Sequence, residues 1–328
     1  MPARIYITRP LPAGVAEHLR EAGMEVEIYP KDQVIPQDVL LRAVEECDGL
    51  LCLLTDMIGR EVLARAGRLR IIANYAVGYN NIDVEEATRR GIAVTNTPGV
   101  LTDATADLAW ALLFAAARRV VEAERYLREG RFQGWGPQLF LGQEITGRTL
   151  GVVGLGRIGR AFASRASAFR MKILYNSLEA DPEFEGAYPY GASRVDLDTL
   201  LQQSDFVSLH VPLTSETHHL IGRRELRLMR PHAVLINTAR GPVVDEAALA
   251  QALREGWIWS AGLDVYENEP AVHPGLLALP NVVLLPHVGS ATFATRLRMG
   301  LMAAGNLIAY FQGRRPPNLV NGGVWKNG

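Results

Sequence analysis

Three segments in the second half of the chain place ionisable side chains directly after apolar runs. LINTARG contains Arg240, GLDVYENEP contains Glu267 and Glu269, and LPHVGS contains His287. In parallel α/β proteins, such strand ends meet at the edge of the sheet where ligands bind. An imidazole exchanges a proton near neutral pH, a carboxylate beside it fixes its tautomer, and a guanidinium binds a carboxylate bidentately. The set suits hydride transfer at a carbon that bears oxygen beside a carboxylate.

The residues alone leave two roles open. Glu267 and Glu269 follow the same apolar run, so either can be the carboxylate partner of His287. Asp264 stands within that run and is either a cofactor contact or a buried structural acid.

A glycine-rich segment, GLGRIG, supplies Gly154, Gly156 and Gly159 in a G-x-G-x-x-G pattern. The pattern follows the apolar run LGVV and opens the helical pattern RIGRAFASRASAF, which is the context of a dinucleotide-binding turn. Such a turn brings the backbone close to a pyrophosphate, and the helix N-terminus offers free N–H groups to it. We therefore expect cofactor contacts from these glycines and from Arg157 and Ile158.

The type of dinucleotide is read at the end of the next predicted strand. A carboxylate there accepts hydrogen bonds from the adenosine ribose and repels a 2′-phosphate. Asn176 and Ser177 stand at this position instead, and Leu178 stands where an arginine for the phosphate would be expected. Both polar side chains can donate a hydrogen bond, so NADP is favoured and NAD remains possible. Glu179 is a late candidate for the missing ribose acceptor.

Short β-branched runs alternate with helical patterns along most of the chain, which predicts parallel α/β architecture. A first series of strands is predicted at residues 4–8, 25–29, 49–55, 69–75 and 91–96. The segments of the second series are TLGVVGLG, MKILYNS, DFVSLHV, AVLINTA, SAGLDVY and VVLLPHV. A long apolar helix is predicted from about residue 101 to 128, and another from about 292 to 312.

Composition restricts the possible partners. The 328 residues carry 34 Lys and Arg against 35 Asp and Glu, so no basic field favours nucleic acid or anionic lipid. The two cysteines, Cys47 and Cys52, lie in or beside an apolar run without metal-ligand spacing, and no metal site is expected. The apolar stretch 108–117 is too short to span a bilayer. With no signal peptide visible, we expect a cytoplasmic protein.

With these segments in this order, the sequence resembles the D-isomer-specific 2-hydroxyacid dehydrogenase family, in particular its glyoxylate and hydroxypyruvate reductase branch. The resemblance rests on GLGRIG, HVPLT, NTARG, GLDVYENEP and PHVGSAT, together with Val77-Gly78, Pro98-Gly99-Val100 and the run 104–107. It implies an enzyme that reduces small 2-keto acids by hydride transfer from a nicotinamide cofactor.

The resemblance also implies roles for individual residues. His287 would be the general acid/base, Glu269 its hydrogen-bonded partner and Arg240 the cation that binds the substrate. The substrate would further contact the N–H groups of Val77 and Gly78 and the side chain of Leu53. Beside the glycine loop and the strand end at 176–177, the cofactor contacts would be Thr105, Val211, Pro212, Thr217, Thr238, Ala239, Asp264, His287 and Gly289.

The expected fold is α/β with two doubly wound parallel sheets. Residues 1–99 plus 288–328 are predicted to form a flavodoxin-like substrate-binding domain, and residues 100–287 a Rossmann dinucleotide-binding domain. The chain would cross between them twice, which predicts a cleft for the ligands.

The region of Trp110, Phe114, Trp135 and Phe140 carries more apolar surface than a peripheral helix needs. The resemblance implies that this region forms the interface of a homodimer and that Phe140 lines the substrate site of the neighbouring subunit. The alternative is that Trp135 and Phe140 pack only within their own chain. Two other functions are compatible with the sequence. One is a related dehydrogenase of another small acid, such as 3-phosphoglycerate, phosphite or formate. The other is a nicotinamide-sensing binding module like the corepressors of this fold.

Overall fold

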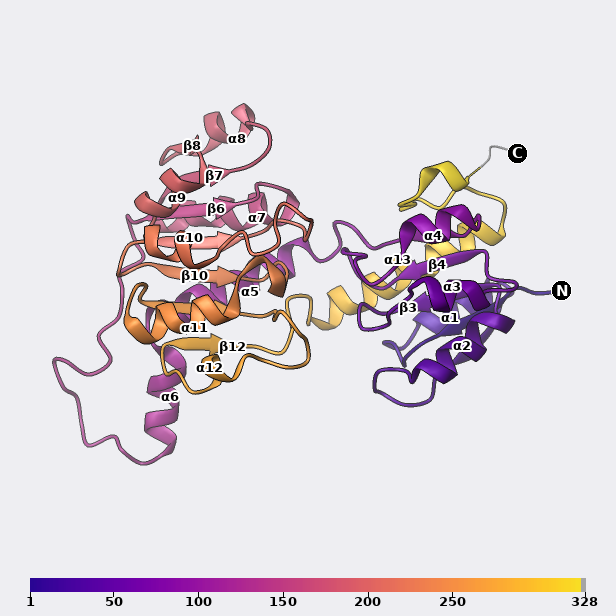
Figure 1. Ribbon diagram of the computed structural model, residues 1–328, viewed down its shortest axis with the longest axis horizontal. Coiled ribbons are helices and arrows are strands. Elements are labelled where there is room, and N and C mark those ends of the chain that lie inside the picture. Colours follow the sequence, from indigo (N-terminus) through magenta and orange to yellow (C-terminus); the bar gives the residue numbers. More distant parts are fainter. Residues whose placement is uncertain (326–328) are drawn as a thin grey trace. The chain divides into compact units, whose positions relative to one another are not determined.

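The computed structural model describes residues 1–325, which form two compact units (Figure 1). Unit 1 consists of residues 1–101 and, as far as they are described, those from 291 onward. Unit 2 consists of residues 102–290. The expected roles of these parts, substrate binding and dinucleotide binding, stay predictions at this stage.

Unit 1 contains a parallel sheet of five strands in the order β2-β1-β3-β4-β5. Its strands are β1 (Arg4–Ile7), β2 (Glu25–Ile28), β3 (Gly49–Cys52), β4 (Ile71–Asn74) and β5 (Ala93–Thr95). This is the doubly wound order of flavodoxin-like proteins, in which ligands bind outside the carboxyl ends of the strands.

Helices cover both faces of this sheet. They are α1 (Val15–Glu21), α2 (Gln37–Glu46), α3 (Arg60–Arg65), α4 (Val84–Arg89) and α13 (Phe293–Phe311). Along β3, Leu50 and Cys52 join the core under α2 and α3, whereas Leu51 joins the core under α1 and α13. This alternation is the period of two expected of a strand buried on both faces. Both cysteines are buried and free.

Unit 2 contains a parallel sheet of seven strands in the order β12-β11-β10-β9-β6-β7-β8. Its strands are β6 (Thr149–Val153), β7 (Lys172–Asn176), β8 (Ala192–Arg194), β9 (Phe206–Leu209), β10 (Val234–Asn237), β11 (Ser260–Leu263) and β12 (Val282–Leu284). Counted within the unit, the first six strands have the order 3-2-1-4-5-6 of dinucleotide-binding folds. The prediction of an α/β protein with two parallel sheets is confirmed.

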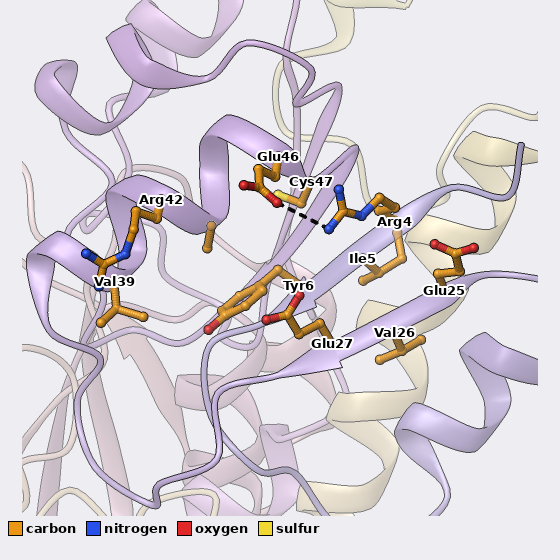
Figure 2. Close-up of a pocket in the computed structure, with 11 residues that line it drawn as sticks. Arg4, Ile5, Tyr6, Glu25, Val26, Glu27, Val39, Arg42, Glu46 and Cys47 are labelled. Atoms are coloured by element: carbon orange, nitrogen blue, oxygen red, sulfur yellow. Dashed lines mark hydrogen bonds and ion pairs between the residues drawn. The ribbon is translucent and has the colours of Figure 1, made fainter.

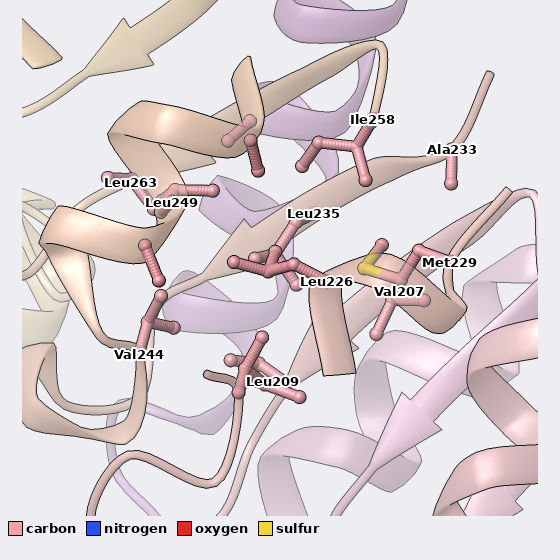
Figure 3. Packing of buried hydrophobic residues seen from close by; sticks show 14 of the residues in the cluster. Val207, Leu209, Leu226, Met229, Ala233, Leu235, Val244, Leu249, Ile258 and Leu263 are labelled. Atoms are coloured by element: carbon pink, nitrogen blue, oxygen red, sulfur yellow. The ribbon is translucent and has the colours of Figure 1, made fainter. Parts of the chain in front are cut away.

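The helices of unit 2 are α5 (Thr102–Ala117), α6 (Val120–Arg128), α7 (Arg157–Arg165), α8 (Pro182–Ala187), α9 (Leu197–Gln203), α10 (Arg223–Leu228), α11 (Glu246–Glu255) and α12 (Pro274–Leu277). On one face of the sheet, Leu209 and Leu235 pack with Leu226 of α10 and Leu249 of α11 (Figure 3). This packing fixes β9, β10 and β11 side by side, so the loops that follow them emerge at one edge.

The prediction of one long apolar helix from 101 to 128 is wrong in one respect, because the structure has two helices there, α5 and α6. The carbonyl of Ala117 accepts a hydrogen bond from the N–H of Gln143, at 2.9 Å, instead of continuing the helical ladder. Arg119 then adopts a left-handed conformation with φ 54°, and α6 starts in a new direction. The hydrogen bond from Gln143 has therefore taken the place of one that would have continued the helix. The periodicity of apolar residues alone does not reveal this exchange.

Candidate active site

His287 and Glu269 are hydrogen-bonded in unit 2, with 2.8 Å between Nδ1 of the imidazole and Oε2 of the carboxylate. Both side chains are about one-third exposed, at 29% and 31%. The backbone of His287 has φ 54°, in the left-handed region that residues other than glycine and asparagine rarely adopt. Strained backbone of this kind clusters at functional sites, where the surrounding structure maintains it.

The environment keeps Glu269 ionised. Burial raises the pKa of this carboxyl, but the hydrogen bond and charge of His287, the N–H of Tyr266 and the charge of Arg240 together hold it below its usual value. Burial also lowers the pKa of the Arg240 guanidinium, and the charge of Glu269 opposes that effect. The three predicted catalytic residues thus lie close enough in unit 2 to influence one another electrostatically.

Glu267, the alternative partner for His287, is engaged elsewhere. One of its oxygens accepts the N–H of Glu246 at the start of α11, and the other contacts the imidazole of His219. Of the two carboxylates that the sequence left as alternatives, Glu269 is therefore the one that is hydrogen-bonded to His287 in the structure.

Asp264 anchors the loop that carries His287. Its two carboxylate oxygens accept the N–H groups of Val288 and Gly289, each at 2.7 Å, and the residue is 1% exposed. Burial raises the pKa of this carboxyl, and the two backbone hydrogen bonds and the charge of His287 counteract that rise. The geometry favours the structural reading of Asp264, and its contact with a cofactor stays a prediction.

The loop after β10 is held by Asn237, which the sequence analysis missed. Its side chain accepts the N–H of Ala239 at 3.0 Å and donates to the carbonyl of Arg240 at 2.9 Å. The Arg240 guanidinium itself donates to the carbonyl of Ala239 at 2.7 Å. The backbone of Gly241 also lies close to that of Tyr266. A β-carbon on Gly241 would lie 1.8 Å from the carbonyl carbon of Tyr266, so this position accepts no side chain.

The glycine loop has the backbone that the motif predicts. Gly154 has φ 93°, and a β-carbon on Gly159 would lie 2.0 Å from the Gly154 carbonyl oxygen, so neither position accepts a side chain. Gly156 and Arg157 are exposed at the start of α7. Nearby in the same unit, the hydroxyl of Thr238 is buried and has no hydrogen-bond partner among the described residues. A free helix N-terminus and an unsatisfied buried hydroxyl fit a phosphate-bearing ligand.

The predicted cofactor contacts that follow β9 form one turn. Thr217 accepts the N–H of Thr214 at 2.8 Å and donates to the carbonyl of Pro212 at 2.6 Å. Val211 precedes this turn, and one of its methyl groups would lie 2.9 Å from a β-carbon on Gly154. Thr105 of α5 is buried beside Gly289. The structure thus places these residues at the same edge of the sheet as the glycine loop.

At the end of β7, Asn176 and Ser177 lie beside the glycine loop. The N–H of Gly154 donates to the Asn176 carbonyl at 2.8 Å. The Asn176 side chain donates to the Val195 carbonyl at 3.0 Å, so one of its two donors is already used. Leu178 is 96% exposed.

In unit 1, the backbone orients Val77 and Gly78. The carbonyl of Ala76 accepts the N–H of Thr97 at 2.9 Å, and the carbonyl of Val77 accepts the side-chain amide of Asn96 at 2.7 Å. In a trans peptide the N–H points opposite to the C=O. The N–H groups of Val77 and Gly78 therefore both point away from residues 96–97, on one side of the loop.

Two buried asparagines connect this loop to the one that carries Leu53. Asn74 donates to the carbonyl of Gly78 at 2.9 Å and to the side chain of Asn81 at 3.1 Å. Asn81 donates in turn to the carbonyls of Leu53 and Asp56, each at 3.1 Å. Asp56, 3% exposed, accepts the N–H of Leu53 at 2.8 Å. The structure thus brings the predicted substrate contacts of unit 1 together through residues that the motifs did not identify.

Phe140 packs within its own chain in this structure. Its ring contacts Tyr126 edge-on at 5.2 Å between centroids, and the Arg119 guanidinium lies 5.1 Å from the ring centre. It also has a positive φ of 49°. A role for Phe140 in a neighbouring site stays a prediction.

One cavity lies away from all predicted site residues. It has a volume of about 360 Å³ and opens between the edge strand β2, strand β1 and helix α2, with Arg4, Tyr6 and Glu27 in its wall (Figure 2). Within residues 1–325 no cluster of three or more His, Cys, Asp or Glu could hold a metal ion. In the same part of the chain, no helix has the length and apolarity to cross a membrane.

Comparison with known proteins gives consistent matches. Residues 110–289 match the family model described as D-isomer specific 2-hydroxyacid dehydrogenase, NAD binding domain. The chain is 54% identical to a glyoxylate reductase of Thermococcus litoralis, with 98% of this chain and 97% of the relative covered.

Two solved structures extend these matches to the fold. A protein of Thermus thermophilus superposes with a TM-score of 0.90 at 48% identity, covering 97% of this chain and 99% of that one. An NADPH-dependent glyoxylate/hydroxypyruvate reductase of Sinorhizobium meliloti, solved with NADP and malonate, gives a TM-score of 0.86 at 35% identity, covering 100% and 99%.

Proposed function

The chain belongs to the D-isomer specific 2-hydroxyacid dehydrogenase family, and from this premise we propose that it reduces glyoxylate and hydroxypyruvate to the corresponding 2-hydroxy acids. The observation that carries the proposal is the His287–Glu269 hydrogen bond of 2.8 Å beside the cationic Arg240. The full-length similarity to a glyoxylate reductase supports the choice of substrate.

The proposed mechanism follows from these side chains. A bound nicotinamide coenzyme supplies the hydride. With Nδ1 committed to Glu269, His287 presents Nε2 to the substrate and protonates the carbonyl oxygen as negative charge develops there. Ionised Glu269 stabilises the imidazolium form before this transfer. In unit 2, Arg240 is the group that we expect to bind the substrate carboxylate. In unit 1, the N–H groups of Val77 and Gly78 stay predicted donors to a carboxylate.

For the cofactor we propose NADPH, used at least as well as NADH. No carboxylate stands at Asn176 or Ser177 to repel a 2′-phosphate. The similar reductase of Sinorhizobium meliloti is NADPH-dependent, which supports this choice. The glycine loop and the buried Thr238 hydroxyl supply the remaining contacts of the proposed binding site.

Steady-state rates on a panel of 2-keto acids, each measured with NADH and with NADPH, test the proposal. We expect glyoxylate and hydroxypyruvate to give the highest kcat/KM values in the panel. Reduction of neither acid with either coenzyme would contradict the assigned activity. A preference for NADH of more than tenfold in kcat/KM would contradict the cofactor assignment alone. Glu179 would then be the first candidate for the residue that accepts hydrogen bonds from the adenosine ribose.

We further propose that a second copy of this chain covers α6 and the loop after it. Large hydrophobic side chains are exposed throughout this stretch, namely Val120, Val121, Leu127, Phe132, Trp135, Leu139 and Leu141. None of the residues of α6 is buried, and the segment projects from the rest of unit 2 (Figure 1). Large hydrophobic side chains that are exposed along one segment are typical of an interface.

Light scattering coupled to size-exclusion chromatography tests the dimer. We expect the native chain to elute with twice the mass of one copy, and Leu127→Asp with Trp135→Asp to give one copy. The matched control is Leu277→Asp, which changes a leucine 63% exposed elsewhere in unit 2. A native chain of single-copy mass would exclude the proposed interface.

A further inference from the structure

Arg194 lies where the cofactor-selecting residues of unit 2 are expected, although it comes from a different strand. It is the last residue of β8, which pairs in parallel with β7 so that Arg194 stands opposite Tyr175. Its guanidinium reaches over the end of β7, where Nε donates to the Ser177 carbonyl at 2.9 Å and Nη2 donates to the Leu178 carbonyl at 2.7 Å. A cation is therefore held at the end of β7 by the carbonyls of Ser177 and of Leu178, the position where an arginine for the phosphate was expected.

These hydrogen bonds leave part of the guanidinium free. Nε and Nη2 lie on one edge of the planar group, so both Nη1 donors on the other side remain for a ligand. The residue is exposed. The nearby carboxylates are already engaged: Glu185 accepts from the Tyr175 hydroxyl and the Arg194 backbone N–H, and Asp181 pairs with Arg160. The positive charge of Arg194 is thus held in place, and within residues 1–325 no carboxylate forms an ion pair with its side chain.

The order of groups along the sheet edge matches the order of groups along a dinucleotide. The glycine loop after β6 receives the pyrophosphate, and the adenosine ribose lies at the end of the neighbouring strand β7. The bond from the Gly154 N–H to the Asn176 carbonyl keeps these two loops adjacent. Strand β8 is the next strand outward, so Arg194 lies on the far side of the ribose position from the glycine loop.

We propose that Arg194 binds the 2′-phosphate of NADPH and thereby determines coenzyme preference, in place of the arginine that Leu178 does not provide. The inference rests on the proposed use of NADPH. A guanidinium matches phosphate geometry and forms charge-assisted hydrogen bonds with it. NADH, which carries a ribose hydroxyl at this position, gains no such charge interaction. The contact therefore favours one coenzyme without affecting the reacting carbon.

The proposed contact can be tested without any keto acid, by measuring the binding of nucleotides that represent the adenosine halves of NADPH and NADH. Isothermal titration compares 2′,5′-ADP with 5′-AMP, which differ only in the 2′-phosphate. We expect native protein to bind 2′,5′-ADP more tightly, and Arg194→Met to reduce that preference by about tenfold or more with little change for 5′-AMP. Arg194→Lys keeps the charge but cannot bridge both carbonyls, so it should retain an intermediate preference.

The matched control is Arg148→Met. Arg148 is also an exposed arginine of unit 2, in an ion pair with Glu144, but it precedes β6 and lies at the opposite end of the strands. It should leave the preference for 2′,5′-ADP unchanged. Kinetics provide the second readout, in which Arg194→Met lowers kcat/KM for NADPH by about tenfold and leaves that for NADH within about threefold.

Three results would overturn the inference. Native protein that binds both nucleotides equally has no 2′-phosphate site. Equal losses for both nucleotides in Arg194→Met would mean that the arginine only supports the loop at 177–178. An unchanged preference in that variant would assign the phosphate to another residue. Because these titrations need no keto acid, they stand even where the proposed substrates fail, so the two failures are distinguishable.

Discussion

In unit 2 the predicted catalytic groups are side chains, whereas in unit 1 the predicted substrate-binding groups are main-chain N–H groups. His287, Glu269 and Arg240 carry their chemistry in their own functional groups, and neighbouring loops orient them. Val77 and Gly78 carry no functional side chain, so the direction of their N–H groups depends on where neighbouring carbonyls are bonded.

This difference determines which residues can be substituted without loss. A side chain that performs chemistry cannot be replaced even when the fold tolerates the change. A backbone donor tolerates changes of its own side chain, but it depends on the groups that bond the adjoining carbonyls, such as the Asn96 side chain, and on buried loop residues such as Asn74 and Asn81. Four variants separate the two arrangements.

His287→Asn should have the largest effect, because it removes the proton donor of unit 2. Asparagine adopts left-handed backbone more readily than most residues, so φ 54° at this position is retained with little strain. We expect turnover to fall by about 100-fold or more, with the dissociation constant of NADPH nearly unchanged. Stopped-flow kinetics and a coenzyme titration measure the two quantities. Near-native turnover would remove His287 from the mechanism.

Arg240→Lys should have the next largest effect. Lysine keeps the positive charge but cannot bind a carboxylate through two parallel N–H groups. We expect a higher KM for the keto acid and a lower turnover, with kcat/KM reduced by roughly 10- to 100-fold. Arg223→Lys, at an exposed arginine on α10, serves as the control. A change in coenzyme affinity without a change in substrate KM would contradict the role in substrate binding.

Asn81→Ala tests the backbone arrangement of unit 1. The variant removes the side chain that joins the carbonyls of Leu53 and Asp56 to Asn74. We expect KM for the keto acid to rise by about tenfold while coenzyme affinity stays constant, because the variant loosens the loop that carries the proposed N–H donors of unit 1 and leaves unit 2 unchanged.

The matched control is Asn281→Ala. Asn281 also donates to two carbonyls, those of Leu253 and Trp259, but lies in unit 2 at the start of β12. A similar loss of thermal stability is expected in both variants, and only Asn81→Ala should change KM. If both variants change KM alike, the effect is one of general stability.

Glu269→Gln should have the smallest effect at the pH optimum but a distinct effect on the pH profile. The paired carboxylate, whose pKa lies below its usual value, stays ionised until the pH falls through that lowered pKa. Above it, the negative charge favours the imidazolium that reduction requires. A neutral amide removes this charge interaction, so the limb at which reduction fails with rising pH should move to lower pH. An unmoved limb would argue that Glu269 does not tune His287.

The difference between the side-chain groups of unit 2 and the main-chain groups of unit 1 also explains which residues could be predicted from the sequence. Alternating apolar runs were sufficient for both sheets, because burial on two faces leaves a pattern that is local in the chain. His287 could be singled out because it follows an apolar strand and a proline. Asn81 and Arg194 could not, since each donates to a backbone carbonyl of another loop and has no local pattern of its own. Asn237 bonds within its own loop, but the motif that contains it, NTARG, does not by itself reveal this bonding.

One signal for Arg194 was nevertheless available. The strand order 3-2-1 of a dinucleotide-binding sheet puts the end of the third strand next to the end of the second. An arginine at the end of the third strand can therefore be examined whenever the second strand lacks its expected residue, although β8 was not among the six strands predicted for this unit. The break between α5 and α6 had no such signal, because it depends on a hydrogen bond from residue 143, twenty-six positions beyond Ala117.

That hydrogen bond has a consequence for how assemblies of this chain can evolve or be redesigned. The Gln143 N–H and the Ala117 carbonyl are 2.9 Å apart, so everything between them leaves the unit and returns at a single point. An excursion with adjoining ends can be shortened or exchanged at little cost in loop closure. Residues 118–142 therefore form a segment that can be exchanged as a unit, and the proposed interface between copies can change while both sheets keep their order.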